Sequence, residues 1–390
     1  MKTEFSYLDE ITSVDGSRIL FPFAETCTYL DSAHYCPYNI ETRHRLSNFI
    51  DAFTTQNIHL GKFTAEIKER LKHKIAKFIN ASEKEIIITS NTTHSLNIVA
   101  NGFKISEKYS VAVADGEFPA LVYPWMNQKR LGRCELFFIP SVNGKINYED
   151  IESTLKLNKI DILSVSSVGF LGFRHNLKKL YEMCIANNVY LIVDAIQSMG
   201  VVPFDAVQEK VHFLGAGGQK WLMSPAGIGF AYMPEFMRNV IEPTYVGTTS
   251  IEYDFENFLN YKLNFQKDGS AYENSTLNLL GMIGLESTID LFTKLGVRNI
   301  FNHITKLLDS FIEGIRDLPY YVESDISEEY RSNILIFSHF NKTRNKYIQQ
   351  ELERQNIFIA LREGFLRISP HIFNNMEDVK KLLIELKKLA

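Results

Sequence analysis

The middle of the chain alternates short, almost fully apolar runs with amphipathic stretches. Short runs rich in branched and aromatic side chains predict β-strands, and the stretches between them have the spacing of helices. Strands that are apolar on both faces belong to sheets covered on both sides, as in mostly parallel α/β domains. Six runs carry this pattern, at residues 86–89, 111–114, 136–139, 162–165, 190–193 and 228–232.

The pattern changes after Ser275, where apolar residues recur at helical spacing as far as about Leu318. This spacing predicts a long connecting helical element. A second, smaller unit follows, in which strand-like and helical patterns are mixed. Its predicted elements are strands at 333–340 and 365–369, a helix at 346–355 and a closing helix from Met376.

These patterns predict two domains. We expect a large domain over residues 20–290, in which a mostly parallel sheet is covered by helices. A small α+β domain is expected from residues 1–19 together with 291–390. Parallel sheets bind their ligands beyond the carboxyl ends of the strands, so polar residues at those ends are the first candidates for function.

Composition and charge narrow the class of partner. The chain has 390 residues, 45% of them hydrophobic, and its 42 basic and 46 acidic side chains are mixed along the sequence. No basic stripe indicates nucleic acid, and nowhere do about 18 apolar residues follow one another as in a membrane span. Residues 1–14 lack the pattern of a secretion signal. We therefore expect a cytoplasmic enzyme with a small-molecule substrate.

The cysteines indicate neither a metal site nor a disulfide framework. They are few, far apart and without CxxC pairs, so no metal is predicted. Cys134 and Cys184 lie in apolar stretches and are expected to be reduced core residues. The four are Cys27, Cys36, Cys134 and Cys184.

Three segments carry candidate chemistry. Asp194 ends the apolar run at 190–193, and Gln197 follows just beyond it. A strand-terminal aspartate can also be a cap or a metal ligand, so Asp194 alone is not decisive. Lys220 stands in a glycine-rich, otherwise uncharged stretch, where burial would lower the pKa of its amine and favour the neutral nucleophile that imine formation requires.

The third segment is Ser90-Asn91-Thr92-Thr93-His94, which ends a predicted strand and opens a predicted helix. Hydroxyl groups and free backbone N–H groups converge at such a junction, where the helix dipole favours an anion. Simple helix capping by Asn91 or Thr92 is the alternative interpretation. The segment is therefore a candidate phosphate site.

Eight motifs together resemble the class V aminotransferase family of fold-type I enzymes that use pyridoxal 5'-phosphate (PLP). This family includes cysteine desulfurases, kynureninases and isopenicillin-epimerase-like proteins. The resemblance implies a large domain with a seven-stranded, mostly parallel sheet and a small α+β domain. The motifs are Tyr29-Leu-Asp-Ser-Ala, Asn91-Thr-Thr-His-Ser-Leu-Asn, Glu117-Phe-Pro-Ala, Val165-Ser-Ser-Val, Asp194-Ala-Ile-Gln, Gly218-Gln-Lys-Trp, Tyr272-Glu-Asn-Ser-Thr-Leu-Asn and Leu366-Arg-Ile-Ser-Pro-His.

The resemblance implies two catalytic residues and a set of cofactor contacts. Lys220 would hold PLP as a Schiff base and remove the Cα proton of the substrate, leaving a carbanion. Asp194 would face the pyridine nitrogen and keep it protonated. The other contacts implied are Phe118 on the ring face, Gln197 at the phenolic oxygen, and Thr92, Thr93 and Gln219 at the cofactor.

Two further residues follow from the resemblance. Thr276 would reach the phosphate of a neighbouring subunit, which implies a homodimer with shared active sites. Arg367 would bind the substrate α-carboxylate through its planar fork, although a solvated strand charge is the alternative. The chain departs from the family at Gly217, where a Ser or Thr is usual, and at Gln219, where a His is usual. These departures imply weaker cofactor binding.

The resemblance leaves several reactions open. An aminotransferase acting on a small amino acid is the first expectation, and a cysteine or C–S lyase or an epimerase is the alternative. A desulfurase that forms a protein persulfide is disfavoured, because it needs a thiol before the carboxylate-binding arginine and no cysteine follows Cys184. We expect Cys36 to be structural.

Two other classes of protein fit the sequence less well. A catalytically silent PLP-fold protein is suggested by Gly217 and Gln219, but the joint presence of Lys220, Asp194 and Arg367 argues against it. A nucleotide-dependent oxidoreductase is weakened because no predicted strand is followed by GxGxxG.

Overall fold

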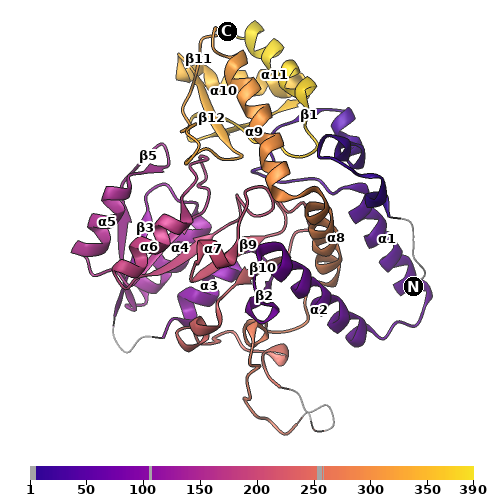
Figure 1. Cartoon of the computed structure of the whole chain (residues 1–390), viewed down its shortest axis with the longest axis vertical. Coiled ribbons are helices and arrows are strands. Elements are labelled where there is room, and N and C mark those ends of the chain that lie inside the picture. The colour runs from indigo at the N-terminus through magenta and orange to yellow at the C-terminus, as the bar shows by residue number, and fades with distance from the viewer. Residues whose placement is uncertain (1–5, 105–107, 253–256, 258) are drawn as a thin grey trace.

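The computed structural model describes residues 6–104, 108–252, 257 and 259–390. Its centre is a seven-stranded sheet, as the resemblance implied, and Figure 1 shows a smaller orange and yellow unit at one end of the molecule. The strand order is β2-β10-β9-β8-β7-β3-β4. The strands are β2 Ile86–Thr89, β3 Tyr109–Ala114, β4 Cys134–Ile139, β7 Ile162–Ser166, β8 Tyr190–Asp194, β9 Phe213–Gly217 and β10 Gly229–Tyr232.

The sheet is parallel except at β10, which runs antiparallel to both β9 and β2. All six predicted strands of this region are present. The seventh, β9, was missed because its sequence Phe-Leu-Gly-Ala-Gly suggests a glycine-rich loop. It forms a strand because the parallel pairing with β8 satisfies its backbone, a tertiary interaction that local propensity does not contain.

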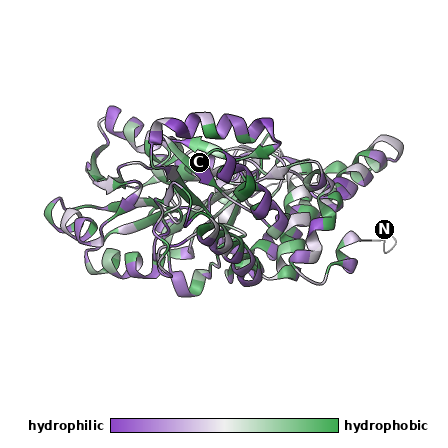
Figure 2. Cartoon of the chain, turned by 90° about the horizontal axis from the view of Figure 1, so that it is seen from above, coloured by the Kyte–Doolittle hydropathy of each residue, from purple (hydrophilic) through white to green (hydrophobic). Residues whose placement is uncertain are grey.

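Successive strand residues enter two different helical layers, as the period of two requires. Ile192 packs with α3 (Thr92–Gly102) and α4 (Pro119–Arg130), whereas Leu191 and Val193 pack in the larger cluster on the other face. Figure 2 shows green strands inside and purple faces on the outer helices. The other helices of this part are α1 Ile40–Thr55, α2 Leu60–Ile79, α5 Tyr148–Leu157, α6 Leu177–Ala186 and α7 Ala206–Glu209.

The predicted long helical element after Ser275 is in fact two helices, α8 (Leu279–Leu295) and α9 (Val297–Gly314). Gly296 separates them with φ at +78°, a conformation that glycine adopts without steric cost. Most of α8 is buried, and it packs against α1 and α2. In the described part of the chain, no helix is both long and apolar enough to cross a membrane.

The C-terminal unit is a four-stranded antiparallel sheet in the order β11-β12-β15-β14, accompanied by α9, α10 and α11. The predicted elements at 333–340, 346–355, 365–369 and after Met376 are all found. The short N-terminal strand β1 (Thr28–Tyr29) pairs with β13 (Ile357–Phe358). The remaining bounds are β11 Tyr320–Val322, β12 Leu335–His339, α10 Asn345–Arg354, β14 Ala360–Arg362, β15 Phe365–Ile368 and α11 Met376–Lys388, and a β5-β6 hairpin spans Ser141–Val142 and Lys145–Ile146.

The division into domains at residues 20 and 290 stays a prediction. Residues 1–5 of the predicted N-terminal part of the small domain lie outside the described residues.

Gly215 lets helix α3 lie directly on strand β9. A Cβ at this position would come within 2.6 Å of the Ser95 Cβ, closer than packed atoms allow. The close approach places the first turn of α3, which carries Thr92, at the carboxyl end of the sheet.

We expect Gly215→Ala to lower the free energy of unfolding by about 1–3 kcal/mol, because the added methyl group overpacks the contact between α3 and β9. Chemical denaturation followed by circular dichroism measures the change. Gly61→Ala is the matched control, since Gly61 lies in the first turn of α2 with only the His59 ring near its Cβ position, at 3.6 Å. An unchanged unfolding midpoint for Gly215→Ala would contradict the packing argument.

Candidate active site

Asp194 is the last residue of β8 and is 1% exposed. It has the same strand parity as Ile192, so it lies on the face of the sheet that α3 and α4 cover. Its Oδ1 accepts a hydrogen bond of 2.8 Å from the Ile196 N–H. Burial raises the pKa of this carboxyl to about 6, against the opposing effects of that hydrogen bond and of Lys220.

Lys220 follows β9, the strand next to Asp194 in the sheet. Its Nζ lies 5.4 Å from the centre of the Phe118 ring. Burial lowers the pKa of the amine to about 8, while Asp194 raises it and Arg367 lowers it further. A substantial fraction of the amine is therefore neutral just above physiological pH, as a nucleophilic lysine requires.

Two buried oxygen atoms without hydrogen-bond partners converge on Gly217. They are Thr92 Oγ1 and Gln219 Oε1, and a Cβ on Gly217 would lie 3.0 Å and 2.7 Å from them. The side chain of Gln219 thus fills the space where the family's hydroxyl group would stand. Unpaired buried polar atoms are costly, so they indicate a ligand that completes them.

This arrangement fits a phosphate group. Thr92 is the first residue of the eleven-residue helix α3, whose N-terminus favours an anion, and Asn91 caps it by accepting from the His94 N–H. Thr93 is exposed at the same turn. The residues present therefore match the phosphate end of PLP, and rotation of the Gln219 amide would turn its NH₂ donor toward it.

Gln197 is held in place by its neighbours. Its Oε1 accepts a hydrogen bond of 2.8 Å from the Trp221 indole, and its Nε2 donates to the Ala33 carbonyl at 3.2 Å. The indole has only a donor, so it fixes the orientation of the amide. One N–H of Gln197 is left for a ligand.

Arg367 reaches the site from β15 in the C-terminal unit and is 1% exposed. Its Nη2 donates to Asp31 Oδ1 at 3.2 Å, its Nη1 donates to the Phe170 carbonyl at 3.1 Å, and its Nε is buried without a partner. The alternative of a solvated strand charge is therefore wrong. The free Nε and the unused Nη hydrogens can still grip a carboxylate.

Two carboxylates at this site, Asp31 and Glu117, were not assigned a function from the sequence. Asp31 pairs with Arg367, and the Glu117 carboxyl accepts hydrogen bonds from Ser166. Both residues lie inside motifs shared with the family, and this position in the sequence could have marked them as candidates. Their sequence neighbours do not show which residue each carboxylate contacts in the folded chain.

Strands β14 and β15 are joined by only two residues, Glu363 and Gly364, at φ values of +48° and +81°. Positive φ at both positions is typical of the tightest hairpin turn. The segment just before Arg367 is therefore a closed turn without a thiol.

Cys36 lies beside Lys220, since its backbone N–H donates to the Gln219 carbonyl at 3.2 Å. The side chain is fully buried, and burial raises the pKa of the thiol. A protonated, enclosed thiol is a poor nucleophile, in agreement with the structural role expected for Cys36.

Thr276 is separate from these residues. It is exposed in the segment before α8, and no described residue is seen bonded to its side chain. The structure brings together Lys220, Asp194, Phe118, Thr92, Gln219, Gln197 and Arg367, and no hydrogen bond joins the exposed Thr276 side chain to any of them.

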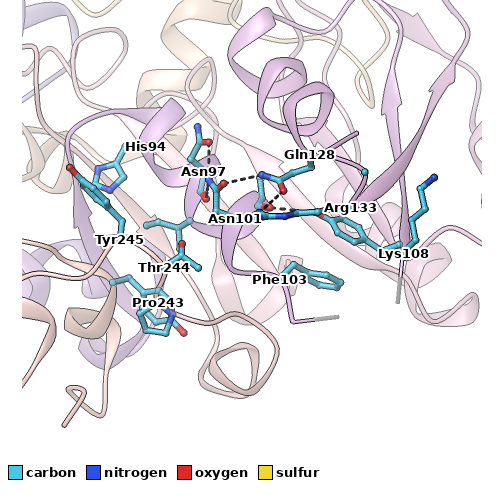
Figure 3. A pocket seen from close by; sticks show the side chains of 15 residues that line it. His94, Asn97, Asn101, Phe103, Lys108, Gln128, Arg133, Pro243, Thr244 and Tyr245 are labelled. Atoms are coloured by element: carbon cyan, nitrogen blue, oxygen red, sulfur yellow. Dashed lines mark hydrogen bonds between the residues drawn. The ribbon is translucent and has the colours of Figure 1, made fainter. Parts of the chain in front are cut away.

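A cavity of about 870 Å³ lies beside α3, and Lys220 is not among its lining residues (Figure 3). A row of amides crosses it: Gln128 donates to Asn101 at 2.9 Å and accepts from Arg133 at 3.2 Å. Tyr245 and His94 border its other end. The cavity reaches His94 in the first turn of α3, but none of the catalytic candidates lines it. In the described residues no cluster of three or more metal-ligating side chains is found.

Comparison with known proteins gives the family and the cofactor. A model of the aminotransferase class-V family matches residues 29–382. A "Probable cysteine desulfurase" of Pyrococcus abyssi is 29% identical, and the match covers 86% of this chain and 87% of that protein. Among solved structures, the enzyme C-DES with glycine covalently linked to its PLP cofactor superposes with a TM-score of 0.87 at 20% identity, covering 95% and 98% of the two chains.

The same enzyme, described as a cystine C–S lyase, has been solved with its reaction product cysteine persulfide. It superposes with a TM-score of 0.85 at 21% identity, covering 94% of this chain and 99% of that one. At this identity the likeness shows the fold.

The lowered pKa of Lys220 makes PLP addition to the apoprotein pH-dependent. We expect the rate to rise with pH and to level off above about 8, since only the neutral amine attacks the aldehyde. Asp194→Asn should shift this rise to lower pH, because the Asp194 charge raises the Lys220 pKa. Stopped-flow absorbance measures the rate.

Lys220→Ala should abolish the addition, and Asp317→Asn, an exposed position, should leave the pH profile unchanged. A profile that is flat between pH 6 and 9, or that survives in Lys220→Ala, would contradict the assignment of Lys220.

Proposed function

Because this chain belongs to the class-V aminotransferase family of PLP-dependent enzymes, we propose that it acts on a small sulfur-containing amino acid as a C–S lyase. Its relatives support this choice: the protein from Pyrococcus abyssi is described as a cysteine desulfurase, and C-DES as a cystine C–S lyase. The first expectation from the sequence, an aminotransferase, becomes the second candidate.

The observation that carries the proposal is the absence of a usable thiol beside an otherwise complete set of residues. The two-residue turn before Arg367 has no cysteine, and Cys36 is buried with a raised thiol pKa. Desulfurases that pass sulfur to the protein need a thiolate nucleophile. A lyase needs none, because the Cβ–S bond breaks with its electron pair on sulfur and the sulfur species leaves directly.

We assign the following roles to the residues of this chain. PLP, when bound, supplies an aldehyde for amine attachment and a ring that accepts electrons. Lys220 holds the cofactor and its Nζ then removes the Cα proton, while the charge on Asp194 favours a protonated ring nitrogen. Arg367 binds the α-carboxylate and so orients the Cα–H bond. The cofactor is gripped by Thr92, Thr93, Phe118, Gln197 and Gln219.

Transamination shares these residues and differs in what happens after the proton has left Cα. It would return the proton to the cofactor side and release a 2-oxo acid with its sulfur still attached. It would also require a second 2-oxo acid to complete the cycle. The two reactions are thus separable by their products.

We also propose that the enzyme works as a homodimer in which Thr276 completes the phosphate site of the partner subunit. The exposure of its side chain within its own subunit supports this. In a two-fold dimer each subunit then donates one Thr276 and receives one. The cavity beside α3 lies next to the turn that the partner's threonine must approach.

We expect the enzyme to convert cysteine or cystine to pyruvate, ammonia and sulfide or persulfide, measured by coupled pyruvate assay and by cyanolysis of persulfide. Cys36→Ala should keep the activity within about twofold, because no protein thiol takes part, whereas Lys220→Ala should lose it. Alanine as the main product, or loss of activity in Cys36→Ala, would favour a persulfide relay instead. Dependence on an added 2-oxo acid would favour transamination.

Mixing a variant that lacks Lys220 with a variant that binds PLP more weakly tests the shared site. Thr276→Ala should weaken PLP binding about tenfold, the equivalent of one lost hydrogen bond to a charged group. A heterodimer with Lys220→Ala contains one site with both native residues, so co-expression at limiting PLP should restore activity. Mixing Lys220→Ala with the fully active surface variant Arg354→Gln should give only dilution. A mixture no more active than Thr276→Ala alone would contradict the shared site.

A further inference from the structure

Glu117 lies where strand β7 extends beyond the end of its neighbour β3, so that the hydrogen bonding between these two parallel strands stops. Strand β3 ends at Ala114 and pairs with β7 only as far as Val113 and Ser164. Strand β7 continues to Ser166, whose partner on its other side is Asp194. Beyond Ser164 the edge of β7 that faces β3 has no strand to bond with, so its N–H groups need another acceptor.

The carboxyl of Glu117 is that acceptor. Its Oε1 accepts a hydrogen bond of 2.7 Å from the Ser166 N–H, and its Oε2 accepts from the Ser166 hydroxyl. The nearby Phe118 backbone N–H favours the charged form of the same carboxyl and so lowers its pKa. Both oxygens are thus used to tie the loop after β3 to the end of β7.

The hydrogen bonds between Ser166 and Glu117 also hold the next residue, Phe118, in place. Phe118 begins α4 as its N-cap, and its side chain makes no capping bond. Its ring is 41% exposed, and it lies 5.4 Å from Lys220 Nζ and 5.4 Å from the Phe170 ring. The ring is therefore weakly packed, and its position depends on the backbone that Glu117 anchors.

Burying a carboxylate to make these hydrogen bonds has a free-energy cost. The described residues include no cation paired with Glu117, and burial together with the nearby Asp194 raises its pKa to about 7. A buried charge without an ion-pair partner lowers stability unless its hydrogen bonds offset the loss. Residues retained in such places are candidates for a function beyond folding.

We propose that Glu117 is a positioning residue, which clamps Ser166 and thereby holds the Phe118 ring over Lys220, where it forms one wall of the cofactor site. The inference rests on the proposed function, because it takes Phe118 as the ring that faces PLP. The same clamp keeps the end of β7 in register with Asp194. Glu117 touches neither Lys220 nor Arg367 and acts through its two neighbours.

The experiment measures PLP binding rather than turnover. Apoprotein is titrated with PLP, giving the dissociation constant and the visible circular dichroism of the bound cofactor, which reports how firmly its ring is oriented. Glu117→Ala should bind PLP about tenfold more weakly and lose most of the visible dichroism. Glu117→Gln should stay within about twofold of the parent, because its amide can accept from the Ser166 N–H and donate to the hydroxyl.

Two controls make the result specific. Asp115→Asn removes a charge from the same loop without touching Ser166 and should leave binding unchanged. In the double variant with Phe118→Ala, Glu117→Ala should add almost nothing to the loss caused by Phe118→Ala, because both remove the same wall. If Glu117→Ala does not fold by far-ultraviolet circular dichroism, Glu117→Gln and Ser166→Ala carry the comparison.

Several outcomes would overturn the inference. They are parent-like binding and dichroism in Glu117→Ala, a Glu117→Gln variant as weak as Glu117→Ala, and losses that add independently in the double variant. Where Glu117→Gln and Ser166→Ala are compared instead, the inference predicts PLP binding close to that of the parent for Glu117→Gln and weaker PLP binding for Ser166→Ala. The opposite result would overturn it. Failure of the parent protein itself to bind PLP would instead overturn the proposed function, so the two failures are distinguishable.

Discussion

The electrostatic interaction between buried Asp194 and buried Lys220 is the interaction on which the rest of this site depends. Burial disfavours the charged form of each group, and the opposite charge of the other group favours it. The balance leaves the pKa values at about 6 and about 8, so both groups can exchange a proton close to neutrality. A buried amine with a pKa of about 8 is partly neutral near physiological pH, so it can act as a nucleophile.

That balance requires the surrounding structure to exclude water and to hold the two groups at fixed positions. The parallel sheet supplies the fixed positions, because β8 and β9 are neighbours and both end at the same edge. Helix α3 closes the edge from one side, at a distance that only a glycine at position 215 permits. The C-terminal unit closes it from the other side, where Arg367 brings a second positive charge and its partner Asp31.

The turn before Arg367 has no cysteine, and the proposed function distinguishes this chain on that ground from enzymes that store sulfur on the protein. A two-residue hairpin is rigid and cannot carry a side chain across the site to the substrate. Under the proposed C–S lyase reaction, the released sulfur species would leave through solvent or meet an external acceptor. The same turn places Arg362 and Arg367 on adjacent strands, with Asp31 between their charges. In the proposed function, the substrate carboxylate would therefore meet two arginine side chains that already bind a carboxylate.

The sequence by itself determined much of this protein. The apolar runs predicted six of the seven strands of the large sheet, and the ordered motifs predicted the family and the cofactor. Strand-terminal Asp194 and the uncharged surroundings of Lys220 were readable because hydrophobic burial leaves a local pattern. The sequence also showed that Gly217 stands where the family usually has a Ser or Thr.

Tertiary structure alone decided the rest. Strand β9 depends on pairing with β8, so local propensity could not reveal it. The same holds for Gln219 filling the space beside Gly217, for Asp31 meeting Arg367, and for Glu117 replacing a missing strand. Each of these contacts joins residues that are close only after folding, and the energy of a buried polar group is set by the partner it meets rather than by its sequence neighbours.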